Sequence, residues 1–433
     1  MTKSKIVVCL ISADKVGKNM AGPGVRYFEM AKVLSKHFDL RLLVPDDCDI
    51  KCEGLKILSY DSNSASKSIG KLIQKADVVV AQNLRPPLLR KIRRLNIRHI
   101  ADLYDPLTVE VLEYSKYDNE RQKRSIFDFN YYSLLLQINT ASHLLCASSR
   151  QRDFYTGILS DQKIINPNLY EQNPDIKKLI SLVPFGLSKD KLPPTDIKVI
   201  ESKIPNLKES DKLIFWGGGI WNWFDPLSIV KAVEKISKER DDIKLFFLGV
   251  KHPNPKIKQM EMAQRTIDYC KSHNLLDKYV FFNYGWTPYQ ERVHFLSRAD
   301  IAISTHFDNL ETRLSFRTRV LDYLWADIPM ILSEGDSMAD LCQEKNLGVV
   351  VRFQDVKEIE QAILALADNK NRIGEIKSNI AEAKAEFYWE NCLKDLIGHI
   401  KNGDFINRPK STAKFLSLSA KFYLAGFRKK YLK

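Results

Sequence analysis

Two arginines and one aspartate lie close together in the segment 304–336, where a helical pattern begins. The run Arg317-Thr-Arg-Val-Leu-Asp322 follows Ser315, whose side chain is typical of a helix N-cap. The positive end of a helix dipole repels cations, at a cost of about 0.3–1 kcal/mol for each arginine in the first turn. A bound phosphate removes this repulsion, because helix N-termini bind anions. The residue types therefore predict an anion site at Arg317 and Arg319.

A rotation of about 100° per residue separates two faces of this expected helix. Phe316, Val320 and Leu324 fall on an apolar face. Arg319 and Asp322 fall on a separate polar stripe. A cation and a carboxylate in one row suit the phosphates and the ribose hydroxyls of a nucleoside diphosphate. An ion pair between Arg319 and Asp322 on a solvated face explains the same pattern without any ligand.

Glycines that let a ligand approach the backbone follow the first strand-like run of each half of the chain: Gly22, Gly24, Gly217, Gly218 and Gly219. The second group is the more specific signal, because three consecutive glycines directly follow an apolar run. Asp225 and Pro226 then fit the N-cap and the first position of a helix. This loop lacks the Gly-x-Gly-x-x-Gly spacing of dinucleotide-binding folds and the Gly-Lys-Ser/Thr of a phosphate loop.

Further candidates follow other strand-like runs, where parallel sheets place their ligands. Those suited to contact a base, a sugar or a phosphate in the second half are Asn222, Trp223, Tyr284 and Trp286. The indole of Trp223 either stacks on a sugar or holds its loop in place. In the first half, Asp105 ends a strand-like run before Pro106 and fits either a site carboxylate or a helix N-cap.

The composition indicates a globular protein with room for two domains. The chain has 433 residues, of which 44% are hydrophobic and 28% are charged. No apolar run is long enough for a transmembrane helix. The N-terminal apolar run is short and lacks a cleavage pattern, so it favours a buried strand over a signal peptide. The scattered cysteines show no metal-binding pattern and suit thiols in a reducing cytoplasm.

The net charge of +14 is concentrated in two basic segments without acidic residues, 85–99 and 408–433. Such segments suit either nucleic acid or an anionic membrane. In the second segment Phe415, Leu418 and Phe422 share one face of a helix, with basic residues beside it. This pattern favours an amphipathic helix at a membrane surface. The alternative is a terminal helix packed on the second domain.

Strand-like and helical segments alternate along the chain, which is typical of α/β folds with parallel sheets. The expected strands are 5–12, 40–45, 78–82, 99–103 and 143–148 in the first half, and 212–216, 244–249, 279–283, 300–305, 329–333 and 348–352 in the second. A charged segment with two consecutive prolines separates the halves. A helical stretch, 369–401, is expected to close the second half.

These residues together resemble the GT-B glycosyltransferases, nearest to the retaining family-4-like group that builds bacterial surface polysaccharides. The resemblance extends over residues 5–401 and is firmest at 217–219, 284–288, 299–304 and 321–333. It implies two Rossmann-like parallel-sheet domains facing a central cleft, plus the basic C-terminal amphipathic tail. The expected parts are an acceptor domain, a linker, a nucleotide-sugar donor domain and the tail, at 1–190, 191–211, 212–402 and 403–433.

The resemblance also implies roles for individual residues. In such enzymes a carboxylate on the helix after the Ala-Asp-Ile strand holds the donor ribose, and Asp322 stands there, where the family usually has Glu. The family's first Glu falls at Leu314, so Glu311 is the nearest candidate for the donor-sugar contact. The family's Arg and Lys after the glycine loop are absent, and Arg317 and Arg319 are expected to supply the missing cations.

The function implied is transfer of a sugar from a nucleotide-diphosphate donor to a glycan or polyprenyl-diphosphate-linked acceptor in cell-surface polysaccharide synthesis. The candidate catalytic residues are Glu311, Arg319 and Asp105, with Asp105 as the base if the reaction inverts the anomeric centre. No metal, no cofactor and no nucleic acid is expected. The expected location is cytoplasmic and peripheral, on the inner face of the membrane through residues 411–433.

Three other functions stay open on the sequence. A nucleotide-sugar 2-epimerase has the same architecture and needs no acceptor. A metal-dependent GT-A enzyme would use the Asp47-Cys-Asp49 triplet. A non-catalytic basic protein would bind nucleic acid or membrane through its charge alone.

Overall fold

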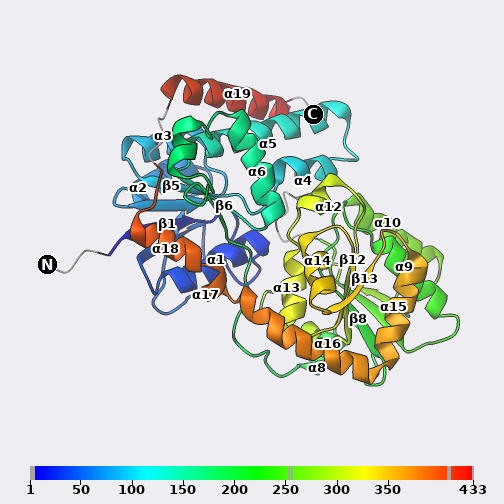
Figure 1. Cartoon of the computed structure of the whole chain (residues 1–433). Coiled ribbons are helices and arrows are strands. Elements are labelled where there is room, and N and C mark those ends of the chain that lie inside the picture. The colour runs from blue at the N-terminus through cyan, green and yellow to red at the C-terminus, as the bar shows by residue number, and fades with distance from the viewer. Residues whose placement is uncertain (1–4, 252–253, 255–256, 407–410, 432–433) are drawn as a thin grey trace. The chain divides into compact units, whose positions relative to one another are not determined.

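The computed structural model describes residues 5–251, 254, 257–406 and 411–431 (Figure 1). The chain forms two compact units. Unit 1 contains the residues up to Phe185 and those from Trp389 onward, and unit 2 contains Gly186 to Tyr388. Unit 2 is therefore inserted, in sequence, between the two segments that make up unit 1.

In the described part of the chain, unit 1 is built on a seven-stranded parallel sheet with the order β3-β2-β1-β4-β5-β6-β7. Its strands are β1 Val7–Ile11, β2 Asp39–Pro45, β3 Lys56–Tyr60, β4 Val78–Ala81, β5 Arg98–Asp102, β6 His143–Cys146 and β7 Ile180–Leu182. Its helices are α1 Gly22–Leu34, α2 Ala65–Leu72, α3 Pro86–Arg94, α4 Leu107–Tyr114, α5 Glu120–Thr140, α6 Ser149–Asp161, α7 Pro167–Gln172, α17 Trp389–Cys392, α18 Lys394–Asn402 and α19 Thr412–Tyr431.

The central strands of this sheet are apolar on both faces, as a parallel sheet covered by helices requires. Every residue of β4 and β6 is buried. The helix starts carry the expected local signals: α3 begins with Pro86, and Asn119 forms a capping box with Gln122 at the start of α5.

Unit 2 has a six-stranded parallel sheet with the order β10-β9-β8-β11-β12-β13 in its described residues. Its strands are β8 Lys212–Gly219, β9 Ile243–Gly249, β10 Val280–Phe282, β11 Ile301–Ser304, β12 Met330–Ser333 and β13 Gly348–Val351. Its helices are α8 Ile197–Glu201, α9 Pro226–Ile236, α10 Glu261–Ser272, α11 Arg292–Arg298, α12 Leu310–Leu314, α13 Thr318–Trp325, α14 Ser337–Glu344, α15 Val356–Asp368, α16 Lys370–Ala383 and the 3-10 helix η1 Lys384–Phe387.

The predicted α/β fold with two parallel sheets is confirmed, and every expected strand is present. Two strands of unit 1 were not predicted, β3 and β7. The stretch 369–401, expected to close the second half, is divided: α16 and η1 lie in unit 2, whereas α17 and α18 lie in unit 1.

The C-terminal helix α19 lies along α5 in unit 1 (Figure 1). Phe415, Leu418 and Phe422 are buried there, and the ring of Phe422 lies 4.8 Å from that of Phe129 on α5. The apolar face that was predicted to contact a membrane is therefore a core face, and that prediction is wrong. The alternative, packing on the second domain, is wrong as well. No helix in the described ranges has the length and hydropathy needed to span a bilayer.

Candidate functional site

The glycine loop at the end of β8 has a backbone that only glycine adopts without strain. Gly218 has a φ of +120°, and a Cβ added to Gly217 would lie 2.9 Å from the ring of Tyr323. After the loop, Asp225 caps α9 by accepting a hydrogen bond from the backbone N–H of Ser228. The predicted N-cap and the proline at the start of α9 are thus confirmed.

Tyr323 on α13 fixes this loop to the neighbouring strand. Its hydroxyl accepts a hydrogen bond from the Gly217 N–H at 3.0 Å and donates one to the Ile303 carbonyl of β11, also at 3.0 Å. Burial raises the pKa of this hydroxyl to about 12, so it remains a donor at neutral pH. One buried side chain therefore sets the distance between the glycine loop and α13.

Helix α13 begins at Thr318, with Arg317 at the N-cap position. The predicted N-cap, Ser315, instead ends α12, and its hydroxyl donates hydrogen bonds to the carbonyl and the carboxylate of Glu311. That prediction is wrong because a short helix, α12, and a three-residue break at 315–317 precede α13. The first turn of α13 contains no acidic residue, so Arg319 lies there without an acid on its own turn.

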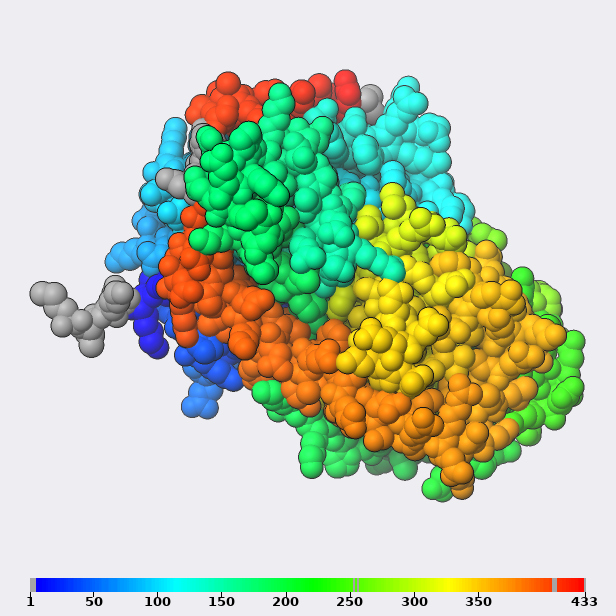
Figure 2. All heavy atoms as spheres, viewed as in Figure 1, coloured from blue at the N-terminus to red at the C-terminus, as the bar shows by residue number. Residues whose placement is uncertain are grey.

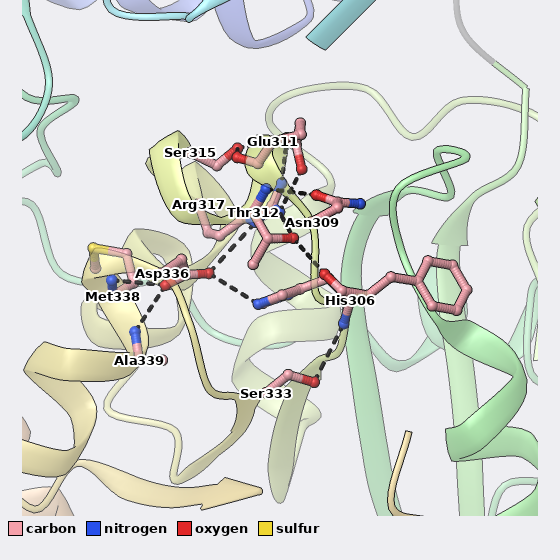
Figure 3. Close-up of polar contacts among 11 residues, drawn as sticks. His306, Asn309, Glu311, Thr312, Ser315, Arg317, Ser333, Asp336, Met338 and Ala339 are labelled. Atoms are coloured by element: carbon pink, nitrogen blue, oxygen red, sulfur yellow. Dashed lines mark hydrogen bonds and ion pairs between the residues drawn. The ribbon is translucent and has the colours of Figure 1, made fainter. Parts of the chain in front are cut away.

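Arg317 is held by two buried carboxylates (Figure 3). Its Nη1 and Nη2 donate to the two oxygens of Glu311 at 2.9 and 2.8 Å. Its Nε lies 3.4 Å from the carboxylate of Asp336. The prediction that Arg317 awaits an external anion is not supported, since its charge is already balanced. Glu311, predicted as a catalytic residue, is 3% exposed and committed to this pair.

Asp336 joins this cluster to α14 and to β11. One of its oxygens accepts hydrogen bonds from the N–H groups of Met338 and Ala339, which caps α14. The other lies 3.3 Å from Nε2 of His306, just beyond β11. Burial raises the pKa of Asp336 to about 6, and burial together with the charge of Arg317 lowers the pKa of His306 well below its usual value. No local sequence pattern indicates this pairing.

Arg319 lies beside the glycine loop with part of its hydrogen-bonding capacity unused among the described residues. Its Nη2 donates to the Gly219 carbonyl at 2.8 Å, and its guanidinium lies 4.0 Å from the Phe224 ring centroid. Its Nη1 is buried without a hydrogen-bond partner among the described residues. The side chain is partly exposed, while its guanidinium is desolvated by its neighbours, which lowers its pKa to about 10. Arg319 is therefore charged at neutral pH and lies beside the glycine loop.

Asp322 pairs with a residue that was not predicted, Arg292 of α11. Nε and Nη2 of Arg292 donate hydrogen bonds to the two carboxylate oxygens of Asp322 at 3.3 and 3.2 Å. The Asp322 side chain is 33% exposed. The expected alternative, an ion pair from Arg319 to Asp322, is wrong. The carboxylate of Asp322 keeps an exposed part that can accept hydrogen bonds from hydroxyl groups.

Of the aromatic candidates of unit 2, Trp223 is buried, Trp286 is half-buried and Tyr284 is exposed. Trp223 is buried and stacks on Trp221 with ring centroids 5.1 Å apart. Asn222 is also buried, and its Oδ1 accepts a hydrogen bond from the Met262 N–H at the start of α10. These two residues support the loop from inside, and their predicted role as donor contacts stays a prediction.

A small open pocket beside the loop contains the remaining predicted aromatic. It is lined by Gly219, Trp221 and Trp286, with Lys258 at the same opening. Tyr284 precedes Trp286 and is exposed, but it does not line this pocket. The structure thus brings Trp286 and the glycine loop together at one opening in unit 2.

The predicted residues of unit 1 lie at the carboxyl ends of β1 and β5. Gly24 in the first turn of α1 has no room for a side chain, because a Cβ there would lie 2.3 Å from the Lys15 carbonyl oxygen. Gly22 has open space around it. Asp105 follows β5 and is not the N-cap of α4, which is Pro106. The carboxyl group of Asp105 is half-buried.

An ion pair that the sequence analysis missed fixes the start of α1. Arg26 and Asp102 are fully buried and form two hydrogen bonds of 2.8 Å. Arg26 also donates to the carbonyls of Val183 and Pro184. The Gly22–Gly24 turn is therefore held by a buried charge pair that joins α1 to β5 and to the end of the first segment of unit 1.

Comparison with known proteins identifies the domain that carries this site. Residues 200–386 match a sequence family described as glycosyl transferases group 1. The protein is a glycosyltransferase. A search of curated proteins finds no match. Within the described ranges, no group of three His, Cys, Asp or Glu side chains is placed to hold a metal ion.

Solved structures share the fold of this glycosyltransferase at low sequence identity. Alr3699/HepE of Anabaena, in complex with UDP and glucose, has a TM-score of 0.63 at 9% identity, and the match covers 92% of this chain and 100% of that one. Sucrose-phosphate synthase of Thermosynechococcus elongatus has a TM-score of 0.61 at 12% identity, with coverages of 92% and 99%. WaaG, a glycosyltransferase involved in lipopolysaccharide biosynthesis, has a TM-score of 0.58 at 13% identity, with coverages of 92% and 100%. The predicted GT-B fold is confirmed.

Proposed function

We propose that this enzyme transfers a sugar from a nucleotide-diphosphate sugar, and that unit 2 binds the donor diphosphate at Arg319. The observation that carries the proposal is the buried Nη1 of Arg319, which has no hydrogen-bond partner in the described residues. A desolvated cation at the start of a helix is unfavourable alone and favourable beside a phosphate. The neighbouring Gly218 leaves the backbone open to close approach.

The chemistry expected there is stabilisation of the leaving group. As the sugar–phosphate bond breaks, negative charge develops on the diphosphate, and a preorganised guanidinium lowers the energy of that state. The exposed part of Asp322 suits the ribose hydroxyls, and Trp286 suits the base. A cation fixed by the protein can do this without a metal ion, so we propose a metal-independent reaction.

We propose transfer with retention of the anomeric configuration. The departing phosphate can then accept the acceptor proton, and no dedicated protein base is needed. If the reaction inverts instead, Asp105 of unit 1 is the candidate base. The stereochemistry of the product, read by NMR of the anomeric proton, separates the two cases.

The proposed acceptor is a glycan or a polyprenyl-diphosphate-linked glycan at the inner face of the cytoplasmic membrane. The support is the basic character of residues 408–433 and of α3. Arg408, Lys410 and Lys433 of that segment lie outside the described residues. Two structures of the same fold have related descriptions: Alr3699/HepE is seen with UDP and glucose, and WaaG is involved in lipopolysaccharide biosynthesis.

The donor proposal is tested by thermal shift against UDP, GDP, ADP and the corresponding nucleotide sugars. At least one nucleotide is expected to raise the melting temperature, and Arg319→Ala is expected to abolish that shift. Arg313→Ala is the matched control, because Arg313 is an exposed cation on the adjacent helix α12. A shift that survives Arg319→Ala unchanged would show that the diphosphate binds elsewhere.

A further inference from the structure

Helix α19 carries a second apolar stripe in addition to the face that packs on α5. Five of its large hydrophobic side chains are between 46% and 60% exposed: Leu416, Tyr423, Leu424, Phe427 and Tyr431. Thirteen large hydrophobic residues are exposed in the described chain, so this one helix of 20 residues contributes more than a third of them. Such a concentration marks an interaction surface rather than scattered exposure.

The five side chains form one continuous stripe. At about 100° per residue they fall within an arc of roughly 100° on the helix surface. The buried residues Phe415, Leu418 and Phe422 centre on the nearly opposite side. The outward stripe is thus separate from the contacts that hold α19 to α5. Figure 2 shows α19, in red, at the surface of the molecule.

Cations border this stripe. Lys421 and Arg428 project along one edge and Lys430 along the other by helical spacing, and all three are exposed. The sequence contains no acidic residue from 411 to 433. On the neighbouring helix α3, the guanidinium of Arg93 lies 4.8 Å from the ring centroid of Phe415, so α3 continues the basic surface beside α19.

An apolar stripe flanked only by cations fits an anionic lipid surface. The aliphatic and aromatic groups enter the acyl boundary, and the lysine and arginine groups remain at the anionic headgroups. A second copy of the chain fits poorly, because it would bring the same cations against these ones. The two tyrosines of the stripe suit the boundary between headgroups and hydrocarbon, because each has an apolar ring and a polar hydroxyl.

We propose that α19 docks the enzyme flat on an anionic bilayer through the outward stripe, while its inner face stays on α5. This inference rests on the proposed membrane location and specifies its surface. It also reverses the sequence-based assignment, because the residues that contact lipid are those turned away from Phe415, Leu418 and Phe422.

The test is co-sedimentation of the full chain with two kinds of vesicle, without nucleotide or acceptor. One contains phosphatidylcholine alone, and the other contains phosphatidylcholine and phosphatidylglycerol in equal parts. We expect binding to the anionic vesicles that weakens as salt is raised, because the cations are exposed. Leu424→Ser with Phe427→Ser is expected to lower the partition coefficient by about tenfold or more, since two large apolar groups leave the lipid.

The matched control replaces a leucine and an aromatic residue of similar exposure elsewhere in unit 1, Leu112→Ser with Tyr170→Ser. It is expected to bind like the wild type. Equal binding by the α19 variant and the wild type would overturn the assigned face. Failure of the wild type to bind anionic vesicles, or a dimer that the α19 variant dissociates, would overturn the proposal as a whole.

The nucleotide thermal shift separates this inference from the proposed reaction. The Leu424→Ser, Phe427→Ser variant should keep the donor shift, which also shows that it is folded. If this variant loses vesicle binding but keeps the nucleotide thermal shift, the substitutions have removed the membrane-binding surface and left the donor site intact. Vesicle binding without any donor shift would contradict the proposed donor site and leave the docking surface standing.

Discussion

The carboxylate of Glu311 is buried in unit 2 and balances the charge of Arg317. It accepts hydrogen bonds from Arg317 and Ser315 and is almost fully buried. We therefore expect Glu311→Gln to destabilise the enzyme by about 3 kcal/mol, because Arg317 loses the partner that balances its buried charge. Urea unfolding at neutral pH measures the change.

The matched control for this substitution is Glu344→Gln on the exposed end of α14, which should leave the free energy of unfolding nearly unchanged. A Glu311→Gln enzyme with normal stability and no transferase activity would instead show that this carboxylate contacts the substrate. That outcome would restore the role predicted from the sequence.

At the scale of elements, the β8 loop and α13 act as one assembly. Gly218 provides the backbone conformation, Tyr323 fixes the spacing and Arg319 provides the charge. Gly218→Ala forces a side chain into a φ of +120°, at a cost of about 1–3 kcal/mol of stability. We expect weaker donor binding as well, because the loop moves relative to Arg319. Thermal shift with and without nucleotide measures both effects.

The control for the loop is Gly374→Ala in α16, where a Cβ meets nothing within 4 Å. Alanine there should raise stability by up to about 1 kcal/mol, since it has the higher helix propensity. Donor binding should not change in this variant. Equal donor affinity in Gly218→Ala and the wild type would mean that the loop conformation is not needed for the nucleotide.

At the scale of the whole molecule, α19 is part of the core of unit 1. A chain ending at Asn402 would uncover the apolar side of α5 that Phe415, Leu418 and Phe422 now cover. Loss of these three side chains is expected to cost about 5 kcal/mol of stability. Differential scanning calorimetry should show a lower transition for unit 1 and an unchanged, nucleotide-sensitive transition for unit 2. Identical thermograms for the two chains would contradict this.

Much of the fold could be predicted because its signals are local. Central strands such as β4 are continuous apolar runs, and parallel sheets produce such runs wherever both faces are covered. β3 was not predicted because it is an edge strand that begins with a lysine, and most of its side chains are partly or fully exposed. β7 has only three residues, too few for a pattern.

The candidate site was predictable only where local sequence signals determine it. Arg319 and the glycine loop follow adjacent parallel strands, so strand order brings them together. The partners of the charged residues do not follow from spacing. Asp322 pairs with Arg292, thirty positions away in the sequence. Arg317 pairs with Asp336, and the whole of β12 lies between these two residues in the sequence. These pairs depend on tertiary packing, which helical periodicity does not encode.

The interrupted order of unit 1 has a consequence for synthesis. All seven strands of its sheet leave the ribosome early, but α17, α18 and α19 follow only after the whole of unit 2. At roughly 5–20 residues per second, the apolar side of α5 waits for tens of seconds before its covering helix exists. The nascent enzyme is therefore expected to bind chaperones until α19 has emerged, although unit 2 can fold before then.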